Sequence, residues 1–209
     1  MSPAPANERA AHAAALGHAA PISPEQREEL AHIIRADPDP RVRAVALGAL
    51  VRGASRRAAT ASWRVAACDP DAGVRRRAAE VAPALGASAP ARAVLALLSD
   101  DDPLTAEAAA FALGERPHPG PQVLAALGRA ATTHDDPLVR EAAVAALGAL
   151  GEPGTLSAVL AACDDKPAVR RRAVLALAAF DGPEVEARLR IALTDRDWQV
   201  RQAAEDLLA

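Results

Sequence analysis

Two cysteines and five histidines are the residues of this 209-residue sequence best suited to nucleophilic or metal chemistry. A thiolate can attack a substrate, and an imidazole can accept a proton or bind a metal ion. These residues are Cys68 and Cys163, and His12, His18, His32, His118 and His134. No two histidines stand at the spacing of a metal-ligand pair, and "HDD" at 134–136 matches a loop that ends in a helix-capping aspartate. We therefore expect no catalytic residue, no metal and no cofactor, and two small buried thiols.

A series of arginines at nearly constant spacing forms a further ionisable pattern. Arg140 lies in "DPLVREAAVAALG" (136–148), in the first turn of an expected helix, where a cation costs about 0.3–1 kcal/mol. Aligned on this residue, the sequence contains six copies at intervals of 30 to 34 residues. The slot holds Ala106 in the third copy and an arginine in the other five. These arginines are Arg43, Arg75, Arg140, Arg170 and Arg201.

The segments that carry these arginines have the pattern of amphipathic helices. Ala follows the arginine slot by three residues in all six copies, and Leu follows it by seven in five copies. The offsets −1, +3, +4 and +7 lie on one face of a helix. An aspartate at the cap and a proline at the first helical position begin most copies. The six expected helices span 39–50, 71–82, 102–113, 136–147, 166–177 and 197–208.

Another helical segment precedes each of these six, so the repeating unit is a helix–turn–helix of about 31 residues. These first helices are expected over 23–36, 56–68, 90–99, 121–133, 154–163 and 183–193. Residues 5–18 contain "RAAHAAALG", which matches "REAAVAALG" at 140–148 in register and predicts one extra helix. In the last copy Glu205 replaces the apolar residue at +4, which is typical of the polar outer face of a terminal repeat.

Composition narrows the class of protein further. Apolar residues make up 51% of the sequence and aromatic residues only 2%, which favours close-packed, alanine-rich helices over a β-sandwich. A net charge of −3 gives no global reason to expect nucleic acid or anionic lipid. No apolar run approaches the length of a membrane span, and the N-terminus lacks the pattern of a secretory signal. We expect a cytoplasmic monomer that binds neither membrane nor nucleic acid.

The segments "DDPLVREAAVAALGALGEPGTLSAVLAAC" and "DRDWQVRQAA" resemble the HEAT-like repeat of the phycobilisome-lyase type. The resemblance covers residues 20–209 and implies an all-α fold. The fold would be a right-handed α-α superhelix of about six helical hairpins plus an N-terminal helix. We assign residues 1–20 to a capping half-repeat and 21–209 to the solenoid. Its repeats are expected at 21–52, 53–86, 87–116, 117–151, 152–181 and 182–209.

The resemblance implies a structural role for the five arginines, as a ladder between neighbouring repeats. A guanidinium in a first turn can pair with a carboxylate, or with turn carbonyls, of the adjacent copy. A functional alternative is a basic stripe for phosphates. Because Ala106 cannot pair in this way, we expect the third junction to open earliest.

In this family the second helix of each repeat usually lines the concave side, so offsets +1, +2 and +5 should face outward. We expect a non-catalytic interaction module or adaptor that binds a protein partner on this face. The candidate partner-binding residues are Arg76, Arg77, Glu107, Phe111, Arg171, Arg172 and Leu175. Trp198 is expected to pack within the last repeat. Two alternatives stay open: a phycobilin-lyase-like or other small-molecule lyase or attachment factor, and a nucleic-acid-binding HEAT-like protein.

Overall fold

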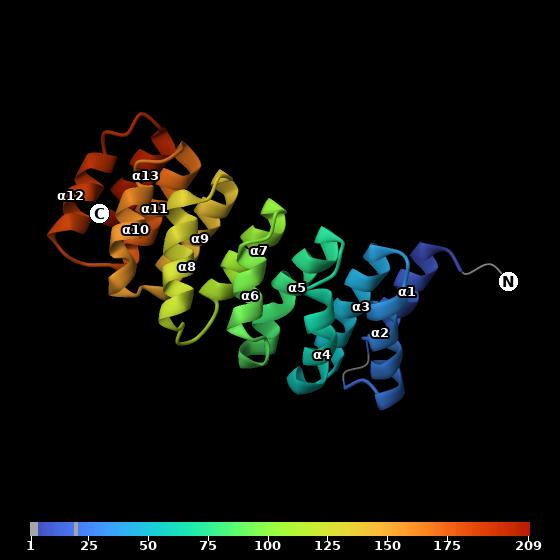
Figure 1. Cartoon of the computed structure of the whole chain (residues 1–209). Helices are drawn as coiled ribbons and strands as arrows, with labels where there is room; N and C mark the ends of the chain where they lie inside the picture. Colours follow the sequence, from blue (N-terminus) through green and yellow to red (C-terminus); the bar gives the residue numbers. More distant parts are fainter. Residues whose placement is uncertain (1–3, 19–20) are drawn as a thin grey trace. The chain divides into compact units, whose positions relative to one another are not determined.

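The computed structural model describes residues 4–18 and 21–209, and over these ranges it is all-α with thirteen helices and three short 3-10 turns (Figure 1). The first helices of the repeats are α2 (Pro24–Ala36), α4 (Arg56–Ala66), α6 (Ala91–Leu98), α8 (Pro121–Thr133), α10 (Leu156–Ala162) and α12 (Pro183–Ala192). The second helices are α3 (Pro40–Gly53), α5 (Ala72–Leu85), α7 (Pro103–Gly114), α9 (Pro137–Leu150), α11 (Pro167–Ala176) and α13 (Trp198–Leu208). The extra helix α1 spans Ala6–Leu16. Six hairpins plus an N-terminal helix confirm the predicted fold class.

Local signals explain where the helices begin. Ser23 and Gln26 form the reciprocal capping box at the start of α2. The Asp136 side chain accepts the backbone N–H of Leu138 at 2.8 Å, and proline follows it at the first helical position. Equivalent aspartate caps begin α3, α5 and α13. Lys166 offers no side-chain cap at α11; instead, the neighbouring Asp165 accepts the Lys166 N–H at 2.6 Å.

The chain divides into two compact units, residues 1–112 and 113–209, and each is built in the same way. In the N-terminal unit the second helices α3 and α5 pack side by side, and α1 packs on α3. The first helices α2 and α4 form the other layer. In the C-terminal unit α9, α11 and α13 follow one another in one layer, and α8 packs beside α10 in the other. The division falls within α7, the helix that carries Ala106.

The core of each unit consists of the repeat positions predicted from the helix periodicity. The residue before the arginine slot is at most 1% exposed wherever it is Val, and Thr105, which replaces Val in the third copy, is buried. The alanine at +3 is fully buried in all six copies. The residue at +4 is buried in the first five copies, whereas Glu205, at +4 of the last copy, is exposed. Leu208, at +7 of the last copy, is 42% exposed.

Three expectations about burial are wrong. Cys68 is exposed at the turn after α4, whereas Cys163 is buried as predicted. Trp198 is 64% exposed at the start of α13 and does not pack within the last repeat. Gly48, at offset +5, is buried because the Arg77 guanidinium covers it; a Cβ there would meet Arg77 Nη2 at 2.6 Å. Within the described ranges, no helix has the length and apolar character needed to cross a membrane.

Candidate functional site

Four of the five predicted ladder arginines bind an aspartate of the following repeat with two parallel hydrogen bonds. Arg140, for example, donates Nε to Asp165 Oδ2 at 2.6 Å and Nη2 to Asp165 Oδ1 at 2.7 Å. The other pairs are Arg43 with Asp69, Arg75 with Asp100 and Arg170 with Asp195. We call these ladder pairs. Each lies within one compact unit, and the arginine side chains are 8 to 21% exposed.

The remaining amino group of each guanidinium holds a backbone carbonyl in the turn of its own repeat. Arg43 Nη1 donates to Asp37 O at 2.9 Å, and Arg140 Nη1 donates to His134 O at 2.6 Å. The sequence left open a carboxylate or turn carbonyls of the adjacent copy as partners. The adjacent copy supplies the carboxylate, and the carbonyl comes from the arginine's own repeat. This carbonyl bond explains why an arginine lies in a first turn. Its Nη1 donates to a loop carbonyl of its own repeat, and its Nε and Nη2 donate to the carboxylate of the next repeat.

The carboxylates of the ladder pairs are not the helix caps. The capping Asp71 and Asp197 are already used by their own helices, and the ladder partner lies two residues before them; at α11 it is Asp165, one residue before Lys166. This partner also accepts a backbone N–H: Asp69 Oδ1 accepts from Asp71 at 2.9 Å, and Asp195 Oδ1 accepts from Asp197 at 2.8 Å. Hydrogen bonds from the arginines lower the pKa of Asp100, Asp165 and Asp195.

The N-terminal helix supplies a ladder pair that the residue-by-residue prediction omitted. Arg9 donates Nε and Nη2 to the two Asp37 carboxylate oxygens at 2.8 and 2.9 Å, and these bonds lower the pKa of Asp37. The signal was present in the sequence, because Arg9 aligns with Arg140 in the match between residues 9–17 and 140–148. His12, at the next core slot of that match, is exposed and contacts Glu29 at 2.6 Å.

The sequence lacks both members of the ladder pair that would follow Arg75 and Asp100. Ala106 replaces the arginine of the third copy, and in the fourth copy His134 stands where another repeat would have the aspartate two residues before the cap. His134 Nδ1 accepts the Asp136 N–H at 3.1 Å, which reproduces one of the aspartate's two roles. Buried Thr105 lies within reach of both Asp102 Oδ2, at 2.7 Å, and Ala72 O, at 3.2 Å.

In the N-terminal unit, four predicted partner-binding residues lie on α5 and α7. Arg76 and Arg77 are partly exposed on α5, and both contact Glu80, with Arg77 at 3.0 Å. Glu80 was not among the predicted residues, although its positions i+4 and i+3 from the arginines could have identified it. On α7, Glu107 is half-buried and the Phe111 ring is 60% exposed. Phe111 is therefore an accessible apolar side chain, and Glu80 partly neutralises the charge of the α5 arginines.

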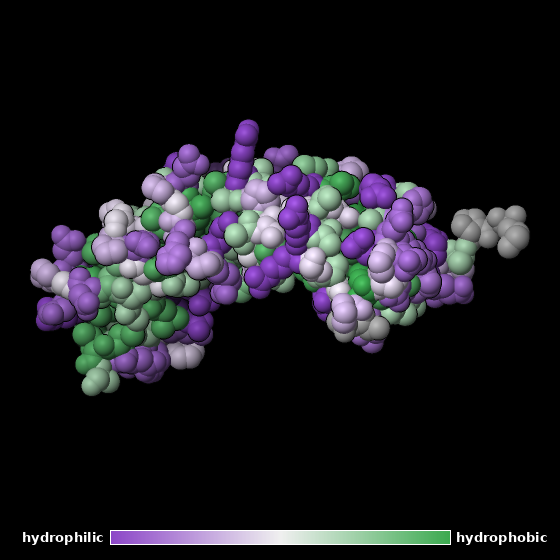
Figure 2. Space-filling view, turned by 90° about the horizontal axis from the view of Figure 1, so that it is seen from below, coloured by the Kyte–Doolittle hydropathy of each residue, from purple (hydrophilic) through white to green (hydrophobic). Residues whose placement is uncertain are grey.

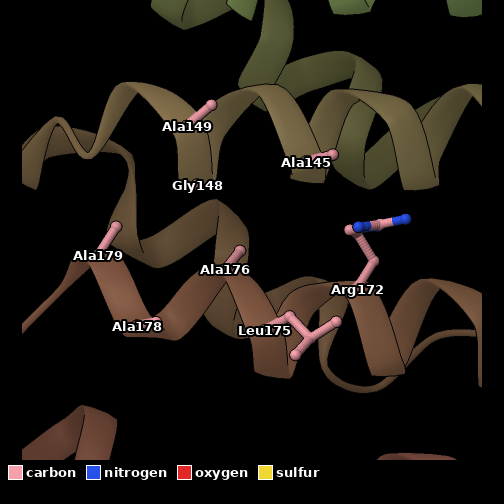
Figure 3. Close-up of a pocket in the computed structure, with 8 residues that line it drawn as sticks. All are labelled: Ala145, Gly148, Ala149, Arg172, Leu175, Ala176, Ala178 and Ala179. Atoms are coloured by element: carbon pink, nitrogen blue, oxygen red, sulfur yellow. The ribbon is translucent and has the colours of Figure 1, made fainter. Parts of the chain in front are cut away.

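In the C-terminal unit, Arg172 and Leu175 line a shallow hollow between α9 and α11 with a volume of about 340 Å³ (Figure 3). Ala145, Gly148 and Ala149 contribute from α9, and the other lining residues are Ala176, Ala178 and Ala179. Gly148 allows a close approach of the helices, since a Cβ there would meet the Ala176 Cβ at 2.7 Å. Arg172 rises from α11 toward α9 at the end of the hollow near Ala145 (Figure 3).

The charges beside this hollow are mixed but mainly basic. Arg172 Nη2 contacts Glu141 Oε1 of α9 at 3.3 Å, a pair between copies 31 residues apart. Arg171 is exposed on the same helix but is not among the residues that line the hollow. No group of three or more His, Cys, Asp or Glu side chains within residues 4–18 and 21–209 is arranged to hold a metal ion. Burial raises the pKa of the Cys163 thiol, which disfavours the nucleophilic thiolate.

Comparison with known proteins gives a family match to part of the chain. Residues 91–168 match the family model described as HEAT repeats. No curated protein matches the sequence.

Several solved structures resemble the whole chain. The YibA protein of E. coli is 18% identical with a TM-score of 0.70, over 99% of this chain and 77% of that protein. A designed armadillo repeat protein in complex with the peptide (KR)4 is 19% identical with a TM-score of 0.59, over 86% of this chain and 98% of the design. An engineered protein is 19% identical with a TM-score of 0.57, over 95% and 96% of the two chains. These likenesses show the fold of the chain, an all-α solenoid of helical repeats.

Proposed function

We propose that this chain is a non-catalytic interaction module that binds a partner protein on the outward faces of its second helices. The observation that carries the proposal is the open hollow between α9 and α11, with an alanine-lined floor and Arg172 at one end. Hydrophobic side chains also gather at the lower left of Figure 2, over the C-terminal unit. Repeat solenoids commonly act as binding scaffolds, and the similar designed armadillo protein carries a bound peptide.

The chemistry of the hollow favours a partner segment with an aliphatic side chain beside an acidic one. The methyl groups of Ala145 and Ala176 and the side chain of Leu175 offer apolar contact and no hydrogen-bonding group. Glu141 pairs with Arg172, and Arg171 on the same helix is exposed, so an acidic residue of the partner would find a complementary charge. Phe111 would serve as a separate aromatic anchor in the N-terminal unit.

Two other functions have less support. A lyase or attachment factor needs an acid or base at its pocket, and the one ionisable residue that lines the hollow is Arg172, whose guanidinium offers hydrogen-bond donors and no acceptor. Nucleic acid would need a continuous basic surface, whereas Glu80 and Glu141 pair with the arginines of this face. The phycobilisome-lyase type of repeat remains a proposal that rests on the D-x-x-V-R-x-x-A pattern.

Selection from a displayed peptide library tests the binding face directly. The wild-type chain should retain peptides that combine Leu, Ile or Val with Asp or Glu. Ala149→Trp should abolish their binding because the new ring fills the hollow, whereas Ala161→Trp, at an exposed position of α10, should not.

Charge reversal gives an independent control. Arg171→Glu should weaken binding of the selected peptides about tenfold, and Arg129→Glu, the same change at an exposed position of α8, should leave them bound. If both tryptophan variants and both charge variants retain the same peptides as wild type, the α9–α11 face is not the binding site.

A further inference from the structure

Arg201 occupies the ladder slot of the last repeat and has the same backbone anchor as the other four predicted ladder arginines. Its Nη1 donates to Asp195 O at 2.7 Å, as Arg43 Nη1 does to Asp37 O at 2.9 Å and Arg170 Nη1 does to Asp165 O at 2.8 Å. In each ladder pair this anchor leaves the Nε–Nη2 edge free to bind both oxygens of one carboxylate. The fold therefore presents the same edge at Arg201.

No carboxylate within the described ranges occupies that edge of Arg201, and its guanidinium is half-buried. Three nearby aspartates already form other interactions. Asp195 is held by Arg170, and Asp197 caps α13 by accepting the Gln199 N–H at 2.9 Å. Asp206 accepts a hydrogen bond from Gln202 at 2.7 Å. Glu205, one turn after Arg201, is exposed and is the one internal competitor on the same helix face.

Trp198 gives the same helix face an apolar surface. It lies three residues before Arg201, so the two side chains share a face of α13, and its ring is 64% exposed. An exposed indole beside an anchored guanidinium is a typical pair of binding anchors, since both lose little conformational freedom when a partner binds.

We propose that Arg201 and Trp198 form a binding site for an aspartate-containing turn of a partner protein. The chain itself shows what this slot binds: Asp37, Asp69, Asp100 and Asp195 each precede a capping aspartate by two residues and each hold a ladder arginine. The occupant is therefore the first aspartate of an Asp-x-Asp turn, with the indole covering the residue that follows.

A second copy of this chain does not supply such a turn. The Asp-x-Asp turns at 37–39, 69–71, 100–102 and 195–197 already have their first aspartate paired with an arginine of the same chain. Giving one of them to Arg201 of another copy would break an internal ladder pair. The site uses different residues from the α9–α11 hollow, so it does not depend on the proposed function.

The experiment is a titration of the ¹⁵N-labelled 209-residue chain with the peptide acetyl-ADPDP-amide, which copies residues 36–40, at low salt. The Arg201 Nε–H signal should move, and of the two indole signals only that of Trp198 should move. The Trp63 indole is buried and donates to Ala78 O at 2.7 Å, so it serves as an internal reference. The amide peptide acetyl-ANPNP-amide should bind at least about threefold more weakly, because it lacks the charged acceptors.

Variants separate this site from other surfaces. Arg201→Lys keeps the charge but loses the fork, and Trp198→Ala removes the ring; each should weaken the peptide at least about threefold. Glu205→Gln should strengthen binding by removing the competitor. Arg190→Gln, a matched loss of one exposed arginine on α12, and Ala149→Trp, which fills the hollow, should leave binding unchanged. Unchanged amide signals of α9 and α11 would show that the Arg201, Trp198, Glu205 and Arg190 variants remain folded, and unchanged signals of α12 would show the same for Ala149→Trp.

Three results would overturn the proposal. The first is an Arg201 Nε–H signal that stays in place at saturating peptide. The second is equal binding of the aspartate and asparagine peptides. The third is an equal response to inorganic phosphate at the same ionic strength, which would show a general anion site. If the hollow retains no library peptide but the Arg201 signal responds to the aspartate peptide, only the proposed function is refuted. If the hollow retains library peptides but the Arg201 signal does not respond, only this site is refuted.

Discussion

Replacing Arg140 by alanine should lower the free energy of unfolding of the C-terminal unit by about 2–4 kcal/mol. The side chain makes four hydrogen bonds, two to the Asp165 carboxylate and two to the carbonyls of His134 and Asp135. The Arg140 and Asp165 side chains are only 11% and 17% exposed, so water replaces the lost bonds poorly. Breaking a fully buried pair costs about 3–5 kcal/mol, and the remaining exposure reduces this value.

Arg201→Ala is the matched control for Arg140→Ala. Arg201 occupies the same slot and has the same kind of carbonyl anchor, but no carboxylate partner in the described part of the chain. Its removal should cost about 1 kcal/mol, the value of one hydrogen bond. The difference between the two variants therefore measures the contribution of the carboxylate together with that of the additional carbonyl bond to Asp135.

Urea denaturation followed by far-ultraviolet circular dichroism measures these differences. A double-mutant cycle of Arg140→Ala with Asp165→Asn should give a coupling energy of about 1–3 kcal/mol. Asparagine retains an oxygen that can accept the Lys166 N–H, so the cycle removes mainly the ion pair. Equal costs for the Arg140 and Arg201 variants, or a coupling energy near zero, would refute the reasoning that ladder pairs stabilise the stack.

Three further predictions concern acid, thiols and local opening. The pKa values of Asp100, Asp165 and Asp195 are lowered, so their stabilisation is complete above the unfolded-state pKa of about 3.9 and is lost as the pH falls through the folded-state values. The melting temperature should therefore fall between pH 5 and pH 2, and less steeply in Arg140→Ala; an equal slope would contradict this. Exposed Cys68 should react with Ellman's reagent in the native protein, and Cys163 only after unfolding, because it is buried and its pKa is raised. Native titration should thus give one thiol per chain, and none in Cys68→Ser. Peptides from α7, whose slot holds Ala106, should exchange amide hydrogens faster than those from α9; slower exchange would contradict the sequence-based expectation for the third copy.

Several parts of the fold could be predicted because their causes are local. Aspartate caps, prolines at first helical positions and apolar residues at −1, +3, +4 and +7 specify each second helix within its own segment. The same pattern occurs in all six copies, so it can be recognised even though it is weak in any one helix. The burial of +3 follows from this periodicity alone, whereas Glu205 occupies the otherwise buried +4 slot, and its exposure is indicated by its charge.

Part of the candidate surface could also have been found from the sequence. Glu80 lies one helical turn after Arg76 and Arg77, so its ion pairs are local. The pair of Glu141 with Arg172 joins two repeats, and its geometry depends on how closely α9 and α11 pack at Gly148.

The sequence by itself determined the helices, their repeat and the positions of the arginines, because these features depend on residues within about one helical turn of one another. Only the tertiary structure decided which oxygen each guanidinium binds, that Trp198 and Cys68 are exposed, and that α9 and α11 leave a hollow. These outcomes depend on the distance and rotation between packed helices. Side chains some 25 residues apart set that geometry together, and no single segment encodes it.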